Sequence, residues 1–595
     1  MRWSTLVRSA SRGLTLLGVV VLVGLLPWLS GRDPALTVLR GRSAEQEATP
    51  EALAAVREQL GLADGPVRLL GRWAAGVVRG DAGTSWVSGA PVLPGALSAL
   101  GVSVTLTAFS LAVALAVAVL VVAPALAAVL RGAPRRTTGV VAASLTALPE
   151  FLLATTLLVV VAVWWGLLPP YGWTGPASAV LPALAMGLPA GGLVGRLVAD
   201  AVATSGAEAW VATWTAAGAP RRAVAHGVLL RAVPPVLPQV GLVVVGLVGG
   251  AVAVERVFAI PGLGRATLGA AQTQDLPVLQ AGMLLLVGLG ALLGVLTDAV
   301  RRLLLGRAVR AGGLVIPSSG HAVRRRDRLV PLTAVVLLVL LVAGGLAGDP
   351  YGAERGRLSP PGAGLLLGAD ASGRDLLARL GQGAGTTIAT ALLVCLASFV
   401  VGLAAGLLPD VTAGPVEVAN AAPPVIAGLL VTAVTGPSAT GAAVAVLLVS
   451  WAPLASHTAA LVAEARAQPH VRVLPVLGVG PVRALLLHVL PMVAGPVLRN
   501  AFLRLPGIAL ALAGLGFLGL GPQPPTPDWG LVLAEGMPYV ERAPWVVLAP
   551  AASLVALSVL AVSASTLAAP RRSRPRAARE AGRHPVAAGG AVRRP

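Results

Sequence analysis

The chain of 595 residues contains no lysine, and all 45 of its lysine-or-arginine positions are arginine. Because a P-loop places a lysine on the nucleotide phosphates, this absence excludes a P-loop ATPase within the chain. The single cysteine, Cys395, excludes an internal disulfide and a cysteine-based zinc site. Charged residues make up only 12% of the chain and hydrophobic residues 56%, with a mean hydropathy of +0.83. Since soluble domains are about 25% charged, these values indicate an integral membrane protein.

Apolar runs long enough to span a membrane occur in two groups of six. They lie at about 14–29, 101–130, 139–165, 178–200, 236–254 and 278–300, and again at about 329–347, 386–408, 418–435, 439–460, 493–518 and 544–568. We therefore predict an all-α, polytopic membrane protein with about twelve transmembrane helices in two six-helix halves. The predicted domains are a first half at 1–300, a basic linker at 301–328, a second half at 329–568 and a basic tail at 569–595.

Arginine placement orients these spans, because short arginine-rich loops stay in the cytoplasm. The segments that then share the cytoplasmic side are 131–136, 207–235, 301–328, 463–491 and the tail. Both termini are therefore predicted to be cytoplasmic. For the tail we expect a disordered segment that is attracted to membrane lipid, in preference to a nucleic-acid-binding arm.

Two of the cytoplasmic loops are built alike. In the first, at about 207–235, Trp210 and Trp214 share one face of a short helix, Gly218 ends that helix, and a basic helix runs from Arg221 towards Pro234. The second, at about 463–491, repeats a glycine turn, a basic segment and a terminal proline. A transporter driven from the cytoplasmic face needs a rigid lever that is tied to two spans and can bury in a partner's groove. The alternative role for the two tryptophans is that of interfacial aromatic-belt residues.

Longer strings carry a specific family resemblance. They are Gly80–Trp86, Leu181–Leu184, 210–235 and Glu255–Gly264 in the first half, and Leu367–Asp370, Gly373–Asp375, Pro423–Pro424 and Gly516–Gly530 in the second. With them the chain resembles permeases of dipeptide, oligopeptide and nickel ABC importers, as a B-type half fused to a C-type half. The resemblance implies a pore-forming, non-enzymatic subunit of the bacterial plasma membrane. It also implies two separate ABC ATPase domains on the cytoplasmic side, which bind ATP and Mg, and an extracytoplasmic substrate-binding protein.

The resemblance assigns the two loops to ATPase coupling. The coupling residues it implies are Trp210, Thr213, Trp214, Gly218, Pro220, Arg221, Arg222 and Pro234, and then His470, Arg472, Gly478, Pro481, Arg483, His488 and Pro491. Arg472 stands where the family has an acidic residue, which leaves open whether the second loop is used. We interpret His226 and His488 as packing or capping residues, because no second metal ligand is near either of them. The chain is thus expected to hold no catalytic residue, metal or cofactor of its own.

Segments rich in proline and glycine lie on the opposite side of the membrane. The resemblance makes them re-entrant or pore-mouth segments under a binding protein, and plain extracytoplasmic loops are the alternative. The residues concerned are Pro261, Gly262, Gly264, Asp370, Arg374, Asp375, Pro524, Pro525, Asp528 and Trp529. Among them, Asp370, Arg374 and Asp375 are expected to form a salt-bridged turn on the receptor-docking face that is exposed to solvent, in preference to a substrate site.

Two other functions compete with the permease hypothesis. A secondary transporter of the major-facilitator type also has two six-helix halves, but it predicts ionisable coupling residues in mid-span and no pair of matching glycine-turn loops. A membrane enzyme would need clustered acids or histidines, and the sequence shows none. A peptide or a related small solute is the substrate that the resemblance suggests.

Overall fold

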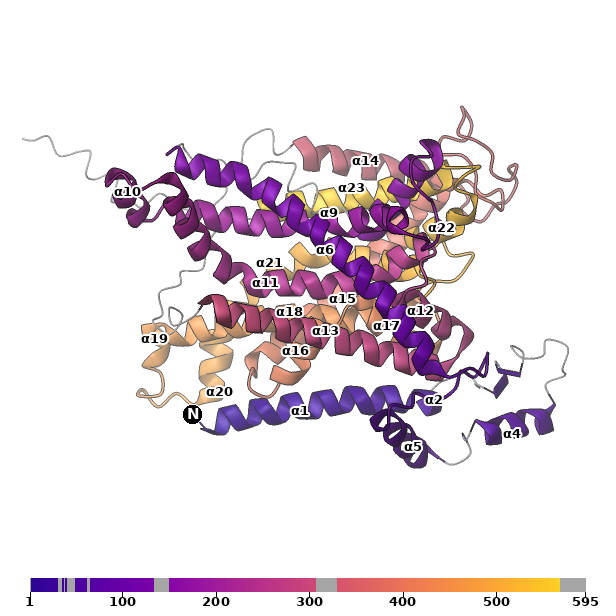
Figure 1. Ribbon diagram of the computed structural model, residues 1–595, viewed down its shortest axis with the longest axis horizontal. Coiled ribbons are helices and arrows are strands. Elements are labelled where there is room, and N and C mark those ends of the chain that lie inside the picture. Colours follow the sequence, from indigo (N-terminus) through magenta and orange to yellow (C-terminus); the bar gives the residue numbers. More distant parts are fainter. Residues whose placement is uncertain are drawn as a thin grey trace, which may run out of the picture.

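The structure is a computed structural model that describes residues 2–29, 35–36, 38–39, 49–60, 62, 65–132, 149–305 and 329–567. Most of these residues are helical, and the only β pairing among them consists of isolated bridges (Figure 1). The basic tail and nearly all of the basic linker lie outside the described residues. The expectations for those two segments therefore stay predictions.

Helices of the first half follow the predicted apolar runs. They are α1 (Arg2–Gly24), α2 (Leu26–Leu29), α4 (Pro50–Gln59), α5 (Pro66–Val78), α6 (Val92–Leu130), α8 (Glu150–Leu157), the π-helix η2 (Leu158–Trp164), α9 (Pro176–Ser205), α10 (Ala209–Ala216), α11 (Arg221–Val257), α12 (Leu263–Thr273) and α13 (Leu276–Leu305).

Helices of the second half repeat the order. They are α14 (Leu329–Leu346), α15 (Leu376–Leu407), α16 (Ala413–Ala421), α17 (Pro424–Thr435), α18 (Ala439–Ala467), α19 (Pro469–Arg472), α20 (Pro481–Ala484), the π-helix η5 (Leu485–Val489), α21 (Leu490–Phe517), α22 (Trp529–Gly536), the 3-10 helix η6 (Met537–Tyr539) and α23 (Trp545–Leu567).

Every one of the twelve predicted runs contains an apolar helix. In the described residues, eight helices have the length and hydropathy needed to cross a membrane, and three shorter apolar helices fall on the remaining runs at 150–164, 331–346 and 545–560. The run at 418–435 is not one straight helix, because α16 and α17 meet at an angle of 101°. The break lies at Pro423 and Pro424, where the missing N–H groups and the restricted preceding residue interrupt a helix. The chain is therefore a polytopic all-α membrane protein.

One predicted boundary is wrong. The basic helix expected to end near Pro234 continues as α11 through that proline to Val257, so the loop helix and the fifth span are one rod. A proline inside a helix leaves the carbonyl four residues earlier, here that of Leu230, without its donor. At the end of a span, water or neighbouring protein can satisfy such a carbonyl, so the helix need not stop.

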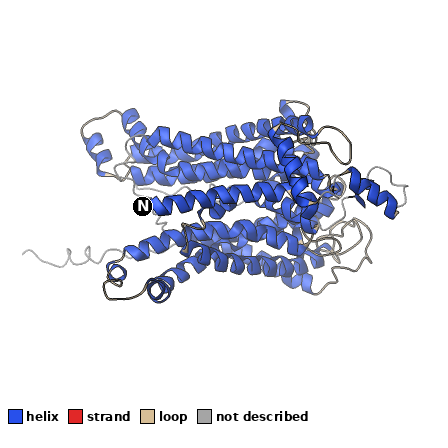
Figure 2. Ribbon diagram, turned by 90° about the horizontal axis from the view of Figure 1, so that it is seen from below, coloured by secondary structure: helices blue, strands red, loops and turns tan. Residues whose placement is uncertain are grey.

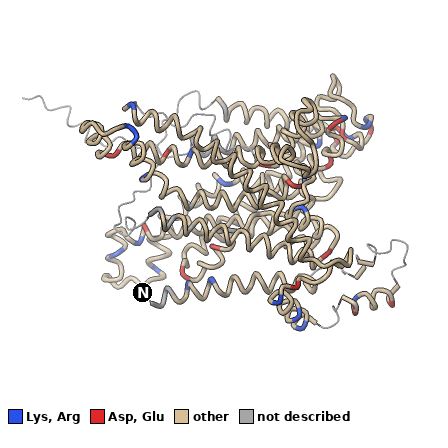
Figure 3. Tube along the Cα trace, viewed as in Figure 1, with Lys and Arg blue, Asp and Glu red and all other residues tan. Residues whose placement is uncertain are grey.

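Opposite ends of the bundle carry different elements. The N-terminus, α10, α19 and α20 lie at one end, and α4, α12 and α22 lie at the other (Figure 1). Seen from below, the long helices run roughly side by side along the same direction (Figure 2). Charged residues gather at the two ends, and few occur midway (Figure 3). The two loops predicted to act together thus share one end, which they also share with the N-terminus.

The first helix packs against the second half. On α1, Arg8 Nε lies 2.6 Å from Asp410 Oδ1, and Arg12 Nη2 lies 2.6 Å from Glu417 Oε1. Further along α1, the carbonyl of Val23 accepts a hydrogen bond of 2.8 Å from Gln280 Nε2 on α13. Because α1 bridges both halves, their separation along the sequence is not a complete separation in space.

Candidate functional site

The first loop is a short helix folded back onto the longer one that follows. Trp210 and Trp214 on α10 pack edge to face, with ring centroids 5.2 Å apart and an interplanar angle of 78°. A Cβ atom at Gly227 on α11 would lie 3.1 Å from the Trp210 ring, so the indole rests directly on the return helix. Trp214 stays 44% exposed. The tryptophan pair therefore both braces the loop and offers an aromatic surface beyond it.

A polar contact locks the same loop. Glu208, which precedes α10, accepts from Trp210 Nε1 at 3.1 Å and pairs with Arg231 Nε on α11 at 2.5 Å. Beneath it lies an apolar cluster whose buried members are Ala201, Val202, Val211, Val224, Val228, Ala232 and Val236. The short helix is thus fixed to the ends of both adjoining spans, as a lever requires.

The second loop has a similar path but another packing. The short helix α19 precedes a series of turns, and the return helix begins with α20. Its buried cluster contains Val462, Ala465, Val471, Leu474, Val489, Val493 and Val497. Arg472, which stands in the family's acidic position, is exposed and belongs to no ion pair among the described residues. Among the described residues, the side-chain contacts that hold this loop to its spans are therefore mainly apolar.

Both loops turn at glycine in the same way. Gly218 has φ of 76° and Gly478 has φ of 77°, a backbone region that favours glycine. In each loop the residue after the glycine donates its N–H to the carbonyl four residues before the glycine, Trp214 or Leu474, at 3.0 Å. At Gly218 this turn follows the end of α10, as the sequence predicted, whereas α19 already ends at Arg472, so Gly478 closes a series of turns and not a helix.

The spacing between the loops changes by one residue after the turn. Up to the glycines, matching positions lie 260 residues apart, as for Val211 and Val471. Along the return helices, the buried series Val228, Ala232 and Val236 matches Val489, Val493 and Val497, which lie 261 residues later. A π-helical turn accommodates one additional residue within a helix, and η5 lies at this point of the second loop. The π-helix therefore absorbs the insertion and keeps the same face buried.

The predicted coupling residues form two separate groups rather than one site. Trp210, Thr213, Trp214, Gly218, Pro220, Arg221 and Arg222 all lie at the first turn, and Pro234 is buried farther along α11. His470, Arg472, Gly478, Pro481 and Arg483 are exposed at the second turn, and His488 Nδ1 is buried without a hydrogen-bond partner. Large apolar side chains also lie exposed there, namely Val476 at 85%, Leu477 at 69% and Val482 at 67%. No sequence rule singled out these three.

At the opposite end of the bundle, a buried carboxylate holds the Glu255–Gly264 segment of the first half in place. Glu255 accepts from Ser103 Oγ at 2.5 Å and from the N–H of Arg265 at 2.9 Å, and Ser103 Oγ accepts from the N–H of Leu263 at 2.8 Å. Gly262 and Gly264 pack against this carboxylate, whereas Pro261 is exposed. The Glu255–Gly264 segment is therefore packed against the end of the bundle by buried hydrogen bonds and is not a free loop.

The Gly516–Gly530 segment of the second half is packed in a similar way. Asp528 caps α22 by accepting from the N–H of Gly530 at 2.9 Å, and burial raises the pKa of Asp528. Trp529 is fully buried and donates through Nε1 to the carbonyl of Leu380 at 2.7 Å. Pro524 and Pro525, which are joined by a cis peptide bond, remain exposed. These contacts bury part of the segment against the bundle, and the choice between a re-entrant segment and a plain loop stays a prediction.

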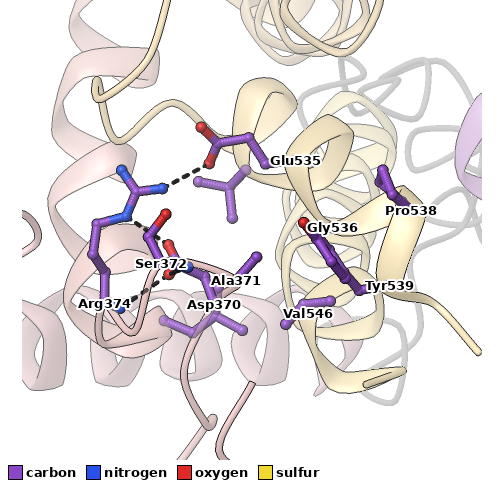
Figure 4. A pocket seen from close by; sticks show the side chains of 11 residues that line it. Asp370, Ala371, Ser372, Arg374, Glu535, Gly536, Pro538, Tyr539 and Val546 are labelled. Carbon is purple, nitrogen blue, oxygen red and sulfur yellow. Dashed lines mark hydrogen bonds and ion pairs between the residues drawn. The ribbon is translucent and has the colours of Figure 1, made fainter. Parts of the chain in front are cut away.

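A buried ionic cluster lies beside α22, which follows this segment (Figure 4). Asp370 Oδ2 is 2.7 Å from both Arg374 Nε and Arg379 Nη1, and Glu535 Oε2 is 2.6 Å from Arg379 Nη1. Burial would raise the pKa of Asp370, but the backbone N–H of Arg374 and the two guanidinium charges lower it below its ordinary value. A cavity of about 240 Å³ opens here, lined in part by Ser372 and Glu535.

The exposed turn predicted around Asp370 is therefore wrong in its exposure. Asp370 and Arg374 do form a salt bridge, but their side chains are only 8% and 10% exposed. Asp375 stands apart from the cluster and caps α15 by accepting from the N–H of Leu377 at 2.8 Å. The sequence could not reveal Arg379 and Glu535, because these partners lie 156 residues apart.

The two halves meet near this end. Arg256 Nη1 donates to the carbonyl of Phe517 at 2.7 Å, and Arg256 Cζ lies 5.5 Å from the centroid of the Phe517 ring. Phe151 stacks on the same ring at 5.6 Å. A Cβ atom at Gly249 on α11 would collide with the ring of Pro423, so only glycine allows this close approach. The halves are thus joined where α11 passes the break between α16 and α17.

Charged side chains also lie within the spans, where none was predicted. Arg499 and Arg504 lie on α21, inside the predicted run at 493–518, and His457 lies on α18. Inspecting each predicted span for cations would have found both arginines, because ionisable residues inside spans are rare. Among the described residues, no group of three or more His, Cys, Asp or Glu side chains is arranged to hold a metal ion. The expectation that the chain binds no metal or cofactor stays a prediction.

Comparison with known proteins agrees with the two-half architecture. A family model described as a binding-protein-dependent transport system inner membrane component matches twice, at 120–310 and 413–574. The chain is 36% identical over 207 residues to the di/tripeptide transport system permease protein DppC of Pseudomonas aeruginosa, covering 33% of this chain and 68% of that protein. It is 33% identical over 245 residues to the dipeptide transport system permease protein DppC of Escherichia coli, covering 38% of this chain and 81% of that protein.

A third relative comes from a different transport system. The metal-staphylopine import system permease protein CntB of Staphylococcus aureus is 29% identical over 281 residues, covering 47% of this chain and 89% of that protein. Each relative therefore corresponds to about one half of this chain. Nothing in these matches favours a major-facilitator transporter. Permease components of this kind are not themselves enzymes, and they work with ATPase and substrate-binding partners. The chain thus belongs to the family of binding-protein-dependent transport system inner membrane components, as a fusion of two ABC-importer permeases.

Proposed function

We propose that this single chain forms the complete transmembrane pore of an ABC importer and fills both permease positions. The observation that carries the proposal is the pair of loops at one end of the bundle. Each loop has its own positive-φ glycine and its own apolar cluster connecting it to two spans. Two levers at the same end suit two motor domains that act side by side.

The end that carries α10, α19 and α20 is proposed to face the cytoplasm and to bind two ABC ATPase domains. ATP and Mg then bind those domains, and this chain supplies motion of the helices without catalysis. The opposite end, with α12, α22 and the ionic cluster, receives an extracytoplasmic substrate-binding protein. The arginine clusters support this orientation in a bacterial plasma membrane, because short arginine-rich loops remain inside.

The solute is proposed to be a peptide or a related small molecule. Two of the relatives named above belong to dipeptide or di/tripeptide transport systems, and a third belongs to a metal-staphylopine import system. The substrate-binding protein makes the first selection, and the pore then passes what it delivers.

Subunit counting tests the central claim. The chain is purified with its ATPase subunits, and the intact complex is weighed by native mass spectrometry. We expect one copy of this chain and two ATPase domains. A functional complex with two copies of the chain would show that one half does not serve as a permease subunit.

Reporter fusions test the orientation independently. A reporter that is active only outside the cytoplasm is fused after Gly313 or after Pro570, and a cytoplasm-active reporter at the same sites is the matched control. We expect the first reporter to be silent and the second to be active at both sites. The reverse pattern at either site would contradict the twelve-span topology.

A further inference from the structure

The helix α5 lies outside the bundle, beside the end of α1 that is farther from the N-terminus (Figure 1). Leu70 and Trp73 on α5 pack against Gly24, where an added Cβ atom would lie 2.5 Å from the first side chain and 2.6 Å from the second. Gly24 ends the apolar stretch Leu6–Gly24, which is long enough to span a membrane. The contact therefore places α5 at the level where the first span reaches the membrane surface.

Exposed side chains follow two lines along α5. Val67 and Val78 are eleven residues apart, which is close to three helical turns, and they are 82% and 87% exposed. Arg68 and Arg79 have the same spacing and are also exposed, and Arg72 lies on the face that they share. Because successive residues of a helix are rotated by about 100°, an apolar line and a cationic line run side by side on this helix.

This pattern suits a membrane surface. An amphipathic helix with arginines on its polar side lies in the plane of the interface, with its apolar residues at the acyl boundary and its cations among the headgroups. Tryptophan is enriched at the same level, and Trp28, which follows α1 on α2, is 54% exposed. The second half has no counterpart of α5, because residues 347–375 between α14 and α15 form turns and isolated bridges.

The two outer arginines of α5 are not neutralised by the described part of the chain. No carboxylate there forms an ion pair with Arg68 or Arg79. Asp81, the acid that follows α5, instead accepts from the N–H of Gly83 through Oδ1 at 2.8 Å. Figure 3 shows a group of positive charges on this helix, at the edge of the molecule. Both guanidinium groups are thus available to an anionic partner.

We propose that α5 lies on the membrane surface and binds anionic phospholipids through Arg68 and Arg79. Val67 and Val78 then rest at the acyl boundary. A guanidinium offers a fork of N–H donors that matches the oxygens of a phosphate. Phosphatidylcholine also carries a phosphate, but its choline cation balances the charge, so lipids with a net negative charge are preferred. Each arginine near an anionic surface strengthens such binding by roughly fivefold.

Fluorescence quenching tests the contact on the full chain in vesicles that mix phosphatidylcholine with phosphatidylglycerol. Cys395, the native thiol, is buried and is first changed to alanine. Gly71→Cys then carries a fluorophore beside Arg68, at an exposed position where an added side chain meets nothing within 4 Å. Gly364→Cys is the matched control, because it is also exposed with open space within 4 Å but lies between α14 and α15, where no such helix exists.

A nitroxide quencher is attached near the glycerol of one lipid and then of the other. At Gly71→Cys we expect phosphatidylglycerol to compete at least fivefold better than phosphatidylcholine, and at Gly364→Cys we expect no preference. Arg68→Gln with Arg79→Gln should reduce the preference to less than twofold, whereas the corresponding lysine variants should keep it. Salt at 1 M, where the screening length is about 3 Å, should also remove it from the native arginines. The salt test decides the matter even if the glutamine variant fails to assemble.

Three results would overturn the proposal. Absence of quenching by either lipid would leave this face of α5 to a soluble partner. Equal quenching by the two lipids, or a preference that survives both the glutamine variant and high salt, would show that the arginines do not select the lipid. Inorganic phosphate at equal ionic strength should not relieve the quenching, and relief would assign the arginines to a free anion instead. The measurement needs neither ATP nor partner subunits, so its outcome is independent of the importer function proposed above.

Discussion

The two coupling loops share a backbone turn but differ in what holds them. The first is fixed by an edge-to-face pair of tryptophans and by the ion pair between Glu208 and Arg231. The second relies on apolar packing, contains a π-helical turn, and leaves Val476 and Leu477 exposed. The difference indicates that the glycine turn and the buried face are the common requirement, whereas each outer surface suits its own partner surface. A loop that had lost its use would not need to keep both common features, so the second loop is expected to function despite Arg472.

Breaking the shared turn should have the largest effect. Gly218→Asp and Gly478→Asp each force a side chain into positive φ, at a cost of about 1 kcal/mol of local strain. That is too little to unfold the bundle, but it displaces the docking helix. We expect each variant to insert normally and to lose at least tenfold in ATP-driven uptake, measured in vesicles at matched protein levels.

A control within the same loop separates strain from charge. Gly480→Asp adds the same carboxylate two residues later, where φ is −62° and the residue caps α20. Because aspartate suits a helix N-cap, this variant should transport normally. If Gly478→Asp were as active as Gly480→Asp while Gly218→Asp was not, the second loop would be a remnant, and the comparison would favour one working lever.

The ends of the two halves opposite the coupling loops differ as well. We expect substitution in the ionic cluster of the second half to destabilise the protein more than substitution at the corresponding end of the first half. In the first half, Ser85 and the N–H of Trp86 simply dock on Asp275. In the second, Arg379 is fully buried between two carboxylates. We expect Arg379→Ala to destabilise this end by about 3–5 kcal/mol, because Asp370 and Glu535 then share the single guanidinium of Arg374 and one negative charge is left uncompensated. Thermal unfolding in detergent measures the loss, and Arg357→Ala, at an exposed arginine on the same segment, serves as the control.

Acid should weaken the same cluster over a defined range. The pKa of Asp370 is lower in the folded protein than in the unfolded chain, so its contribution is fully present above the unfolded value of about 3.9. That contribution is lost as the pH falls through the lower, folded value. The difference in unfolding temperature between the native chain and Asp370→Asn should therefore stay constant from pH 7 to about 5 and shrink below about 4. A difference that already shrinks at pH 6 would indicate that another group controls the cluster.

Composition and spacing predicted much of this molecule. Among the described residues an apolar helix lies in each predicted run, and the two glycines marked both turns, because span length and positive φ leave local traces in a sequence. Contacts between distant residues leave no such trace, so Arg379 and Glu535 could not be paired. Two prolines also act differently. Pro423 lies at a helix break, whereas α11 continues past Pro234, and the surrounding structure decides between the two outcomes.

A smaller effect is expected from the polar lock that only the first loop has. Glu208 and Arg231 are partly exposed, with side chains 32% and 47% accessible, and such pairs contribute roughly 0–1 kcal/mol. Glu208→Gln, Arg231→Gln and the double variant form a cycle whose coupling energy should stay under about 1 kcal/mol. Uptake should fall less than threefold in each. A larger loss would mean that the pair, and not the tryptophans, sets the position of α10.

The smallest effect should follow deletion of Leu487 from the π-helical turn. If η5 exists to absorb one inserted residue, its removal lets the return helix continue as an ordinary α-helix. Val471 and Leu474 before the turn and Val493 after it then keep the relation that the first loop already has, at a constant spacing of 260 residues. Leu487 itself is 60% exposed, so little packing is lost. We expect normal insertion and at least half of the native uptake. Deletion of Val493, which is buried outside the π-helix, is the matched comparison and should abolish uptake, because every later residue of α21 is rotated by about 100° with no bulge to compensate. Equal loss in both deletions would show that the π-helical turn has a role of its own in coupling.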